Sequence, residues 1–308
     1  MKSNIFKFIT LLAIISISFS ACKEDINFTK SVFIDEDEAE LSAFDKWLED
    51  IYLNPYNLQF CYRMQDVEND YNYNLVPTTL HQSQQMAILV KYLWFDVYGK
   101  VASPTFLKKY GPRYIHLIGS AAYNPNLGTM ILGLAEGGIK ITLFRCNDLD
   151  YSSVDDMNEF YFKTMHHEFA HILHQQRTIP KEFETYSAGW YDPMAWQERT
   201  DSEAATLGFV SPYGSSQPRE DFVEVIANYI VKTDEQWETI LDLASKPGVN
   251  QTGDIIVESL DGKSIIETKL EICRKWFRDS WEIELDSLRA EVQERQLHIK
   301  EVVNQKYW

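Results

Sequence analysis

The feature that most constrains this 308-residue chain is the stretch His167-Glu168-Phe169-Ala170-His171, which has the pattern HExxH. At the histidine and glutamate frequencies of this sequence, chance would give such a match about once or twice in a hundred chains of this length. Within a helix, residues four apart project from the same face, one turn apart, so both imidazoles can bind one zinc ion. The motif therefore predicts a helix with a metal site on one face.

Glu168 lies about 100° around the same helix from His167, beside the metal but not bound to it. There its carboxylate can take a proton from a water molecule at the metal and pass it to a leaving amine. The alternative is a set of ordinary histidines on an amphipathic helix. His174 shares the face of His167, but a rise of about 10.5 Å over seven residues argues against both binding one ion. His166 points to another face, where we expect a structural role or support for the ligands.

A catalytic zinc needs three protein ligands and one open position. A histidine six residues after His171 would be one source, but that position is Arg177. The other common source is a glutamate on a later helix, and Glu220 opens the segment Glu-Asp-Phe-Val-Glu that ends at Glu224. One carboxylate can bind the metal while the other hydrogen-bonds a ligand histidine. The alternative is an acidic helix start that only complements the helix dipole.

The N-terminus has the pattern of a secretory signal, because Lys2 and Lys7 precede an apolar run over residues 8–19 that ends at Ser20-Ala21-Cys22. Roughly a dozen apolar residues are fewer than the about 20 that a membrane span needs. The chain is therefore expected to divide into a signal peptide (1–21), a tether (22–38) and a folded domain (39–308).

The net charge of −17 repels phosphate backbones and argues against a nucleic-acid partner. Four cysteines are too few and too scattered for a disulfide scaffold or a CxxC metal cluster. The fold must therefore be stabilised by a hydrophobic core.

Apolar periodicity predicts a mixture of helices and short strands. The expected helices are 43–51, 85–98, 154–176, a short one near 202–207, 220–231 and a long packed one over 264–302. The expected strands are 56–63, 114–119 and 139–144.

One resemblance rests on spacing between motifs. The sequence HEFAH, then EDFVE 53 residues later, with Tyr213 seven residues before Glu220, resembles the zincin metallopeptidases of the anthrax lethal factor and Pro-Pro endopeptidase type. The resemblance implies that His167, His171 and Glu220 bind Zn²⁺, with Glu224 supporting a ligand. It also implies that Tyr213 donates a hydrogen bond to the developing oxyanion, beside Glu168 as the general base. The implied fold is α+β: a zincin-like domain with an active-site helix, a small mixed sheet and a helical C-terminal part.

A wider resemblance covers residues 40–290 and rests on the lipobox-like Cys22, the Gly-rich strand before the HExxH helix, and GFVSPY leading to EDFVE. The chain is similar to zinc metallohydrolase lipoproteins encoded beside outer-membrane nutrient-import systems of Bacteroidota. Lys23-Glu24-Asp25 resembles the signal that sends such lipoproteins to the cell surface. The resemblance implies lipidation at Cys22, an outer-membrane location facing the exterior or the periplasm, and an import complex as partner. Ordinary cleavage after Ala21, leaving a free thiol, is the alternative.

These features favour a metallohydrolase acting on a peptide or protein substrate, which could add a strand to the sheet edge. The rival hypothesis is a non-catalytic binding lipoprotein of an import system, with a structural or catalytically idle zinc. Glu168 discriminates between them, because a structural site needs ligands but no adjacent base. A third hypothesis is an anchored interaction scaffold without a metal, but it would require the HExxH motif to be present by chance.

Overall fold

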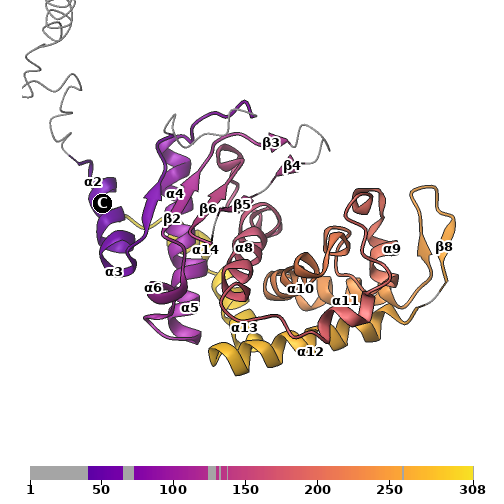
Figure 1. Cartoon of the computed structure of the whole chain (residues 1–308). Helices are drawn as coiled ribbons and strands as arrows, with labels where there is room; N and C mark the ends of the chain where they lie inside the picture. The colour runs from indigo at the N-terminus through magenta and orange to yellow at the C-terminus, as the bar shows by residue number, and fades with distance from the viewer. Residues whose placement is uncertain are drawn as a thin grey trace, which may run out of the picture. The chain divides into compact units, whose positions relative to one another are not determined.

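Three parallel strands and one antiparallel strand form a four-stranded sheet (Figure 1). Its order is β1-β2-β6-β5, and its strands are β1 (Gln59–Cys61), β2 (Tyr114–Leu117), β6 (Lys140–Leu143) and β5 (Gly133–Glu136). β5 runs antiparallel to β6, with Gly133 opposite Leu143. The sheet therefore ends in an antiparallel edge strand.

The expected strands at 114–119 and 139–144 are confirmed, but the one expected at 56–63 is too long. A helix extends to Tyr56, and Asn57 is left-handed with φ of 53°, so only 59–61 are extended and paired. The other elements of the first half are α2 (Ala43–Leu48), η1 (Glu49–Leu53), α3 (Asn54–Tyr56), α6 (Phe106–Tyr110), β3 (Ala122–Tyr123), β4 (Met130–Ile131) and η4 (Cys146–Asp148).

The helix that carries HExxH lies against the edge strand. A continuous helical run consists of α7 (Val154–Met157), the π-helical stretch η5 (Asn158–Phe162) and α8 (Lys163–His174), which confirms the helix expected at 154–176. The Ser153 side chain caps its start by accepting a hydrogen bond from the Asp156 N–H. A Cβ atom at Gly133 would lie 2.2 Å from Thr164 Cγ2 of α8. Only glycine therefore lets α8 approach β5 this closely.

Aromatic side chains hold another face of α8. Phe169 of the motif is fully buried, and its ring centroid lies 5.1 Å from those of Trp94 and Tyr98 in T-shaped contacts. These partners come from a second helical run made of α4 (Leu80–Val90), the π-helical stretch η3 (Lys91–Phe95) and α5 (Asp96–Val101). Because Phe169 is two residues from both His167 and His171, this packing sets the rotation at which α8 presents its histidines.

The second half of the described structure is mainly helical, and α10 (Pro218–Val231) packs against α8 (Figure 1). α12 (Gly262–Trp281) and α13 (Leu285–Gln296) also pack against α10. The other elements are η6 (Phe183–Ser187), η7 (Trp196–Glu198), α9 (Asp201–Thr206), η8 (Tyr213–Ser216), α11 (Asp234–Ala244), β7 (Gly248–Val249), β8 (Ile255–Val257) and α14 (Ile299–Val303).

The single long helix expected over 264–302 is wrong, because the segment forms α12, α13 and α14. Glu282 adopts φ of 57°, and the N–H groups of Glu282 and Ile283 donate to the carbonyls of Arg278 and Phe277, which ends α12. Buried apolar residues on either side of the break join the same core. The apolar stripe therefore continues through a change of direction that periodicity alone does not reveal.

This computed structural model describes residues 41–64, 73–123, 130–131, 133–136, 138–258 and 260–307. Residues Ala43–Trp308 form one compact unit. The expected signal peptide, Cys22 and nearly all of the segment before that unit lie outside the described residues. Within the described part, none of the helices is both long enough and apolar enough to span a membrane.

Candidate metal centre

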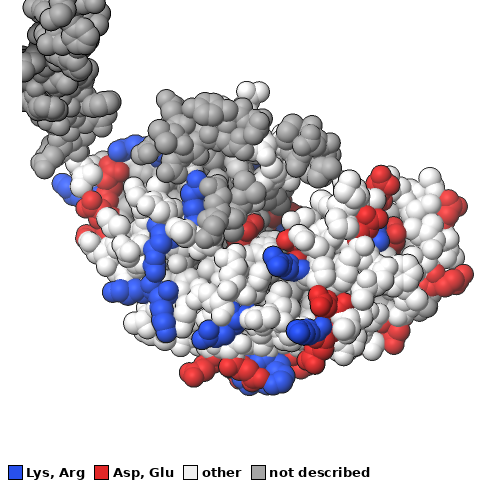
Figure 2. Space-filling view, viewed as in Figure 1, with Lys and Arg blue, Asp and Glu red and all other residues white. Residues whose placement is uncertain are grey.

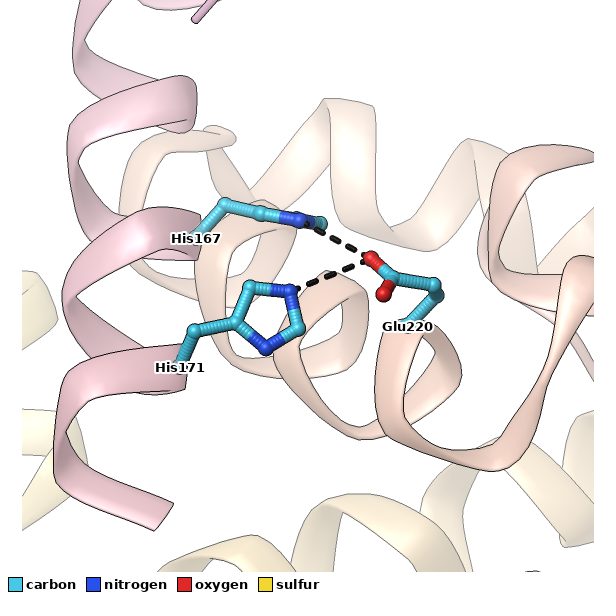
Figure 3. A group of neighbouring side chains, drawn as sticks. All are labelled: His167, His171 and Glu220. Carbon is cyan, nitrogen blue, oxygen red and sulfur yellow. Dashed lines mark hydrogen bonds and ion pairs between the residues drawn. The ribbon is translucent and has the colours of Figure 1, made fainter. Parts of the chain in front are cut away.

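Three side chains from two helices converge at one point (Figure 3). His167 and His171 project from one face of α8, with ring centroids 4.8 Å apart. Glu220 stands in the first turn of α10, and its Oε2 lies 3.2 Å from His167 Nε2 and 3.1 Å from His171 Nε2. One ligand atom from each residue lies within 4.8 Å of the others. The pair of histidines and the distant glutamate expected from the sequence are thus brought together.

The donor set fits zinc. Tetrahedral zinc with bonds of about 2.0 to 2.2 Å places its ligand atoms about 3.3 to 3.6 Å apart, and Glu220 Oε2 lies 3.2 and 3.1 Å from the two imidazole nitrogens. Two nitrogens and one carboxylate oxygen would leave the fourth position open. Burial alone would raise the pKa of Glu220, but hydrogen bonds to His167 and His171 lower it by more. The net pKa is lowered, so the carboxylate is ionised at neutral pH. The three residues can therefore hold Zn²⁺.

Glu224, one turn after Glu220, holds His167 from the far side. His167 Nδ1 lies 2.8 Å from Glu224 Oε1, so the imidazole donates there and keeps Nε2 toward Glu220. Ser211 Oγ and Asn228 Nδ2 donate to the other oxygen of Glu224, at 2.6 and 3.1 Å. Burial opposes ionisation, but Lys163, His167 and Ser211 lower the pKa of Glu224 to about 2. Glu224 thus occupies the supporting position expected for it.

His174 supports the second histidine, a role that the sequence analysis did not assign. His174 Nε2 lies 2.9 Å from His171 Nδ1, three residues earlier on α8. Burial and the neighbouring His171 lower the pKa of His174 to about 4, so its neutral ring can accept the Nδ1 proton of His171. The HxxH spacing of these two residues was the available signal.

His166 points away from the converging ligands, as expected. Its Nδ1 lies 3.1 Å from the Tyr98 hydroxyl in the aromatic core, and burial lowers its pKa to about 3. His166 is therefore neutral and joins the packing that fixes the rotation of α8.

A cleft of about 850 Å³ opens beside the ligands and is lined by His167, Glu168 and Tyr213, among others. Tyr213 begins η8, with its ring centroid 5.8 Å from that of His167 and 4.9 Å from that of Trp196. Burial and the charges of Glu220, Glu224 and Glu168 raise the pKa of Tyr213, so its hydroxyl keeps its proton. The cleft therefore contains both a carboxylate beside the ligands and a phenolic hydrogen-bond donor.

A buried ion pair anchors the start of α10. Lys269 of α12 is fully buried and donates to Asp221 Oδ2 at 2.6 Å, and to Ser187 Oγ and the Gly208 carbonyl at 2.8 Å. Tyr191 also donates to Asp221 Oδ2, at 2.8 Å. This cluster was not predicted from the sequence, although Lys269 stands in the apolar stripe of α12. It joins Ser187, at the end of η6, and the loop residues Tyr191 and Gly208 to the helix that carries Glu220.

With this geometry in place, comparison with known proteins assigns the class. Residues 37–286 match the model of a family described as "Putative zinc-binding metallo-peptidase". Because the match covers most of the chain, the protein belongs to this family. No curated protein matches the chain.

A solved structure is also similar to this chain. It is the crystal structure described as "a putative zinc-binding metallo-peptidase from Bacteroides caccae". The sequences are 44% identical, the TM-score is 0.72, and the match covers 87% of this chain and 96% of that one. The α+β metallopeptidase fold expected from the sequence is thereby confirmed.

Proposed function

We propose that this protein is a zinc-dependent peptidase in which His167, His171 and Glu220 hold the metal. The observation that carries the proposal is the convergence of these three ligand atoms beside a cleft that His167, Glu168 and Tyr213 line. When bound, zinc would act as a Lewis acid, which polarises a carbonyl group and lowers the pKa of a water molecule.

The protein groups around the metal have separate tasks. The Glu168 carboxylate accepts a proton from the attacking water and delivers it to the departing amine. The Tyr213 hydroxyl, which keeps its proton because its pKa is raised, donates a hydrogen bond to the oxygen on which charge develops. Glu224 and His174 hold the two imidazoles in the orientation that ligation requires.

The edge strand β5 gives the substrate a place to bind. Within the described part of the chain, β5 pairs with β6 on one side, and Gly133 at its start lines the cleft. An extended peptide can add to such an edge through main-chain hydrogen bonds, which are independent of its sequence. This favours a peptide or protein substrate over a small amide.

We also propose that the mature protein is a lipoprotein of the outer membrane, anchored at Cys22 and facing the cell surface. The support lies in the sequence alone: a signal-like segment that ends at Cys22, followed by Lys23-Glu24-Asp25. An outer-membrane nutrient-import complex is its proposed partner.

Metal analysis combined with cleavage of a broad peptide library tests the enzymatic proposal. Wild-type protein should carry about one zinc and cleave some peptides. Glu168→Gln should keep its zinc and fold, yet lose turnover by about 10²-fold or more. Tyr213→Phe should also keep zinc and lower kcat, at a cost of about 2.7 to 4 kcal/mol in transition-state stabilisation. Glu267→Gln makes the same charge change as Glu168→Gln at an exposed position of α12 and serves as the control.

Three results would count against this assignment. Cleavage by Glu168→Gln at the wild-type rate would remove the proposed general base. Full zinc occupancy in Glu220→Ala, together with loss of zinc in Asp221→Ala or Glu224→Ala, would show that another carboxylate is the ligand. Zinc binding without turnover across the library would favour the non-catalytic lipoprotein.

A further inference from the structure

Lys163 is a cation enclosed in the wall of the cleft. It lies four residues before His167 on α8, so it shares the face of that ligand and stands about 6 Å along the helix axis. Its side chain lines the cleft and is only 18% exposed. Among the described residues, its ammonium group has a polar contact with Glu159 Oε1 at 3.5 Å, the limit of a hydrogen bond. The Glu159 side chain is 52% exposed, so this contact is largely solvated.

The neighbouring acids leave hydrogen-bonding capacity on Lys163. Burial alone would lower the pKa of Lys163, but the charges of Glu224 and Glu159 raise it by more. The net pKa is raised, so Lys163 is charged at neutral pH. Both oxygens of Glu224 already accept hydrogen bonds, from His167, Ser211 and Asn228. An ammonium group has three donors, and a partly buried ammonium group favours a negatively charged acceptor.

The surrounding wall suits an aliphatic chain that ends in such an acceptor. Val210, Ile240 and Leu243 line the same cleft with apolar side chains. Lys232 adds a second cation, and four acids also line the cleft: Glu159, Glu168, Asp201 and Glu224. The cleft thus combines apolar walls with a partly buried ammonium group beside the metal ligands.

We propose that Lys163 determines substrate specificity by pairing with a carboxylate side chain, aspartate or glutamate, close to the scissile bond. This inference rests on the proposed peptidase function and names the substrate class of the same site. The recognition is local. The protein carries a net charge of −17. In Figure 2, most of the charged side chains over the end formed by α9 and β8 are acidic. The long-range field therefore does not attract acidic peptides, and selection depends on contact inside the cleft.

Matched peptides that differ by one Glu-to-Gln change near the cleaved bond test the inference. Wild-type protein should cleave the Glu peptide with a kcat/KM higher by on the order of tenfold, because a charge-assisted hydrogen bond is stronger than a neutral one. Lys163→Met should abolish this preference, and Lys163→Arg should retain it. Lys108→Met, which removes a charge from an exposed position of α6, should leave both rates unchanged.

A second measurement does not depend on turnover. Two peptide hydroxamates that differ only in a Glu or Gln side chain beside the metal-binding group are titrated into the zinc-loaded protein. Tighter binding of the Glu hydroxamate by wild type, but not by Lys163→Met, would support the inference even if no library peptide is cleaved, and only the peptidase proposal would then fail. Equal binding of the two hydroxamates by wild type would overturn it. A Lys163→Met variant that lowers kcat/KM for both peptides by the same factor would also overturn it, because Lys163 would then only balance Glu224.

Discussion

Replacing Lys269 by methionine tests whether the buried ion pair holds the start of α10. The Lys269 and Asp221 side chains are fully buried, with their charged atoms 2.6 Å apart. Burial lowers the pKa of Lys269 and raises that of Asp221, in each case outweighing the attraction of the partner's charge. Both shifts disfavour the charged form, so the pair as a whole contributes little net stability. Removing only one partner, however, lowers the stability strongly, because it leaves the other charge buried and unpaired.

Lys269→Met leaves the Asp221 carboxylate buried without its cation. Such a change costs about 3 to 5 kcal/mol in the free energy of unfolding. For a folded unit of this size, the loss lowers Tm by about 5 to 9 °C. Adding Asp221→Asn removes the stranded charge, so the double variant should recover more than half of the lost stability. Lys275→Met removes a lysine that is 68% exposed on the same helix and should change stability by less than about 0.5 kcal/mol.

Thermal unfolding of the zinc-free protein, followed by calorimetry, measures these differences. The zinc affinities of the same variants provide a second readout, because Asp221 adjoins the proposed ligand Glu220. Loss of a residue that supports a ligand typically weakens metal binding by about 10- to 100-fold. A single variant that melts within about 2 °C of wild type would refute the role given to the ion pair. The role of the ion pair would also be refuted if the double variant, Lys269→Met with Asp221→Asn, were no more stable than Lys269→Met alone.

Two further predictions concern the second histidine ligand and the membrane anchor. His174→Ala should weaken zinc binding by about 10- to 100-fold while the fold survives, because His171 loses the partner that orients its ring; unchanged zinc affinity in a competition titration would contradict this role. Cys22→Ala should abolish acyl labelling and membrane retention while the folded part remains soluble, and equal membrane association of the mutant and wild type would disprove lipidation at Cys22.

The local part of the site could be predicted from the sequence, because its geometry follows from helical periodicity. Residues four apart share a face in any α-helix, so HExxH places His167 and His171 together before any tertiary structure is known. The same argument places His174 within reach of His171, three residues earlier. Sequence reasoning considered His174 only in relation to His167, across two turns, and so missed its contact with the nearer histidine.

The remaining ligand could not be derived in the same way, because it depends on how two helices pack. Nothing in local periodicity says that the first turn of α10 faces α8, 53 residues after His167. Glu220 was proposed because a catalytic zinc needs a third ligand and an acidic helix start could supply it, and the resemblance to a known spacing then supported that choice. The breaks between α12, α13 and α14 were missed for a related reason, since helices that pack on one core keep one apolar stripe while the chain changes direction.

The acidic start of α10 shows how tertiary contacts distinguish two interpretations of the same sequence. Acids that only complement a helix dipole need no partner and remain solvated. Here Glu220, Asp221 and Glu224 are all buried, so each requires a compensating contact. Helical geometry separates their directions: Glu220 and Glu224 lie one turn apart and face α8, whereas Asp221 lies about 100° around the helix from Glu220 and meets Lys269 of α12. Acids on a buried helix and a lone lysine in the apolar stripe of another helix are chemically complementary, but only the packing of α10 against α12 shows that Asp221 and Lys269 form the pair.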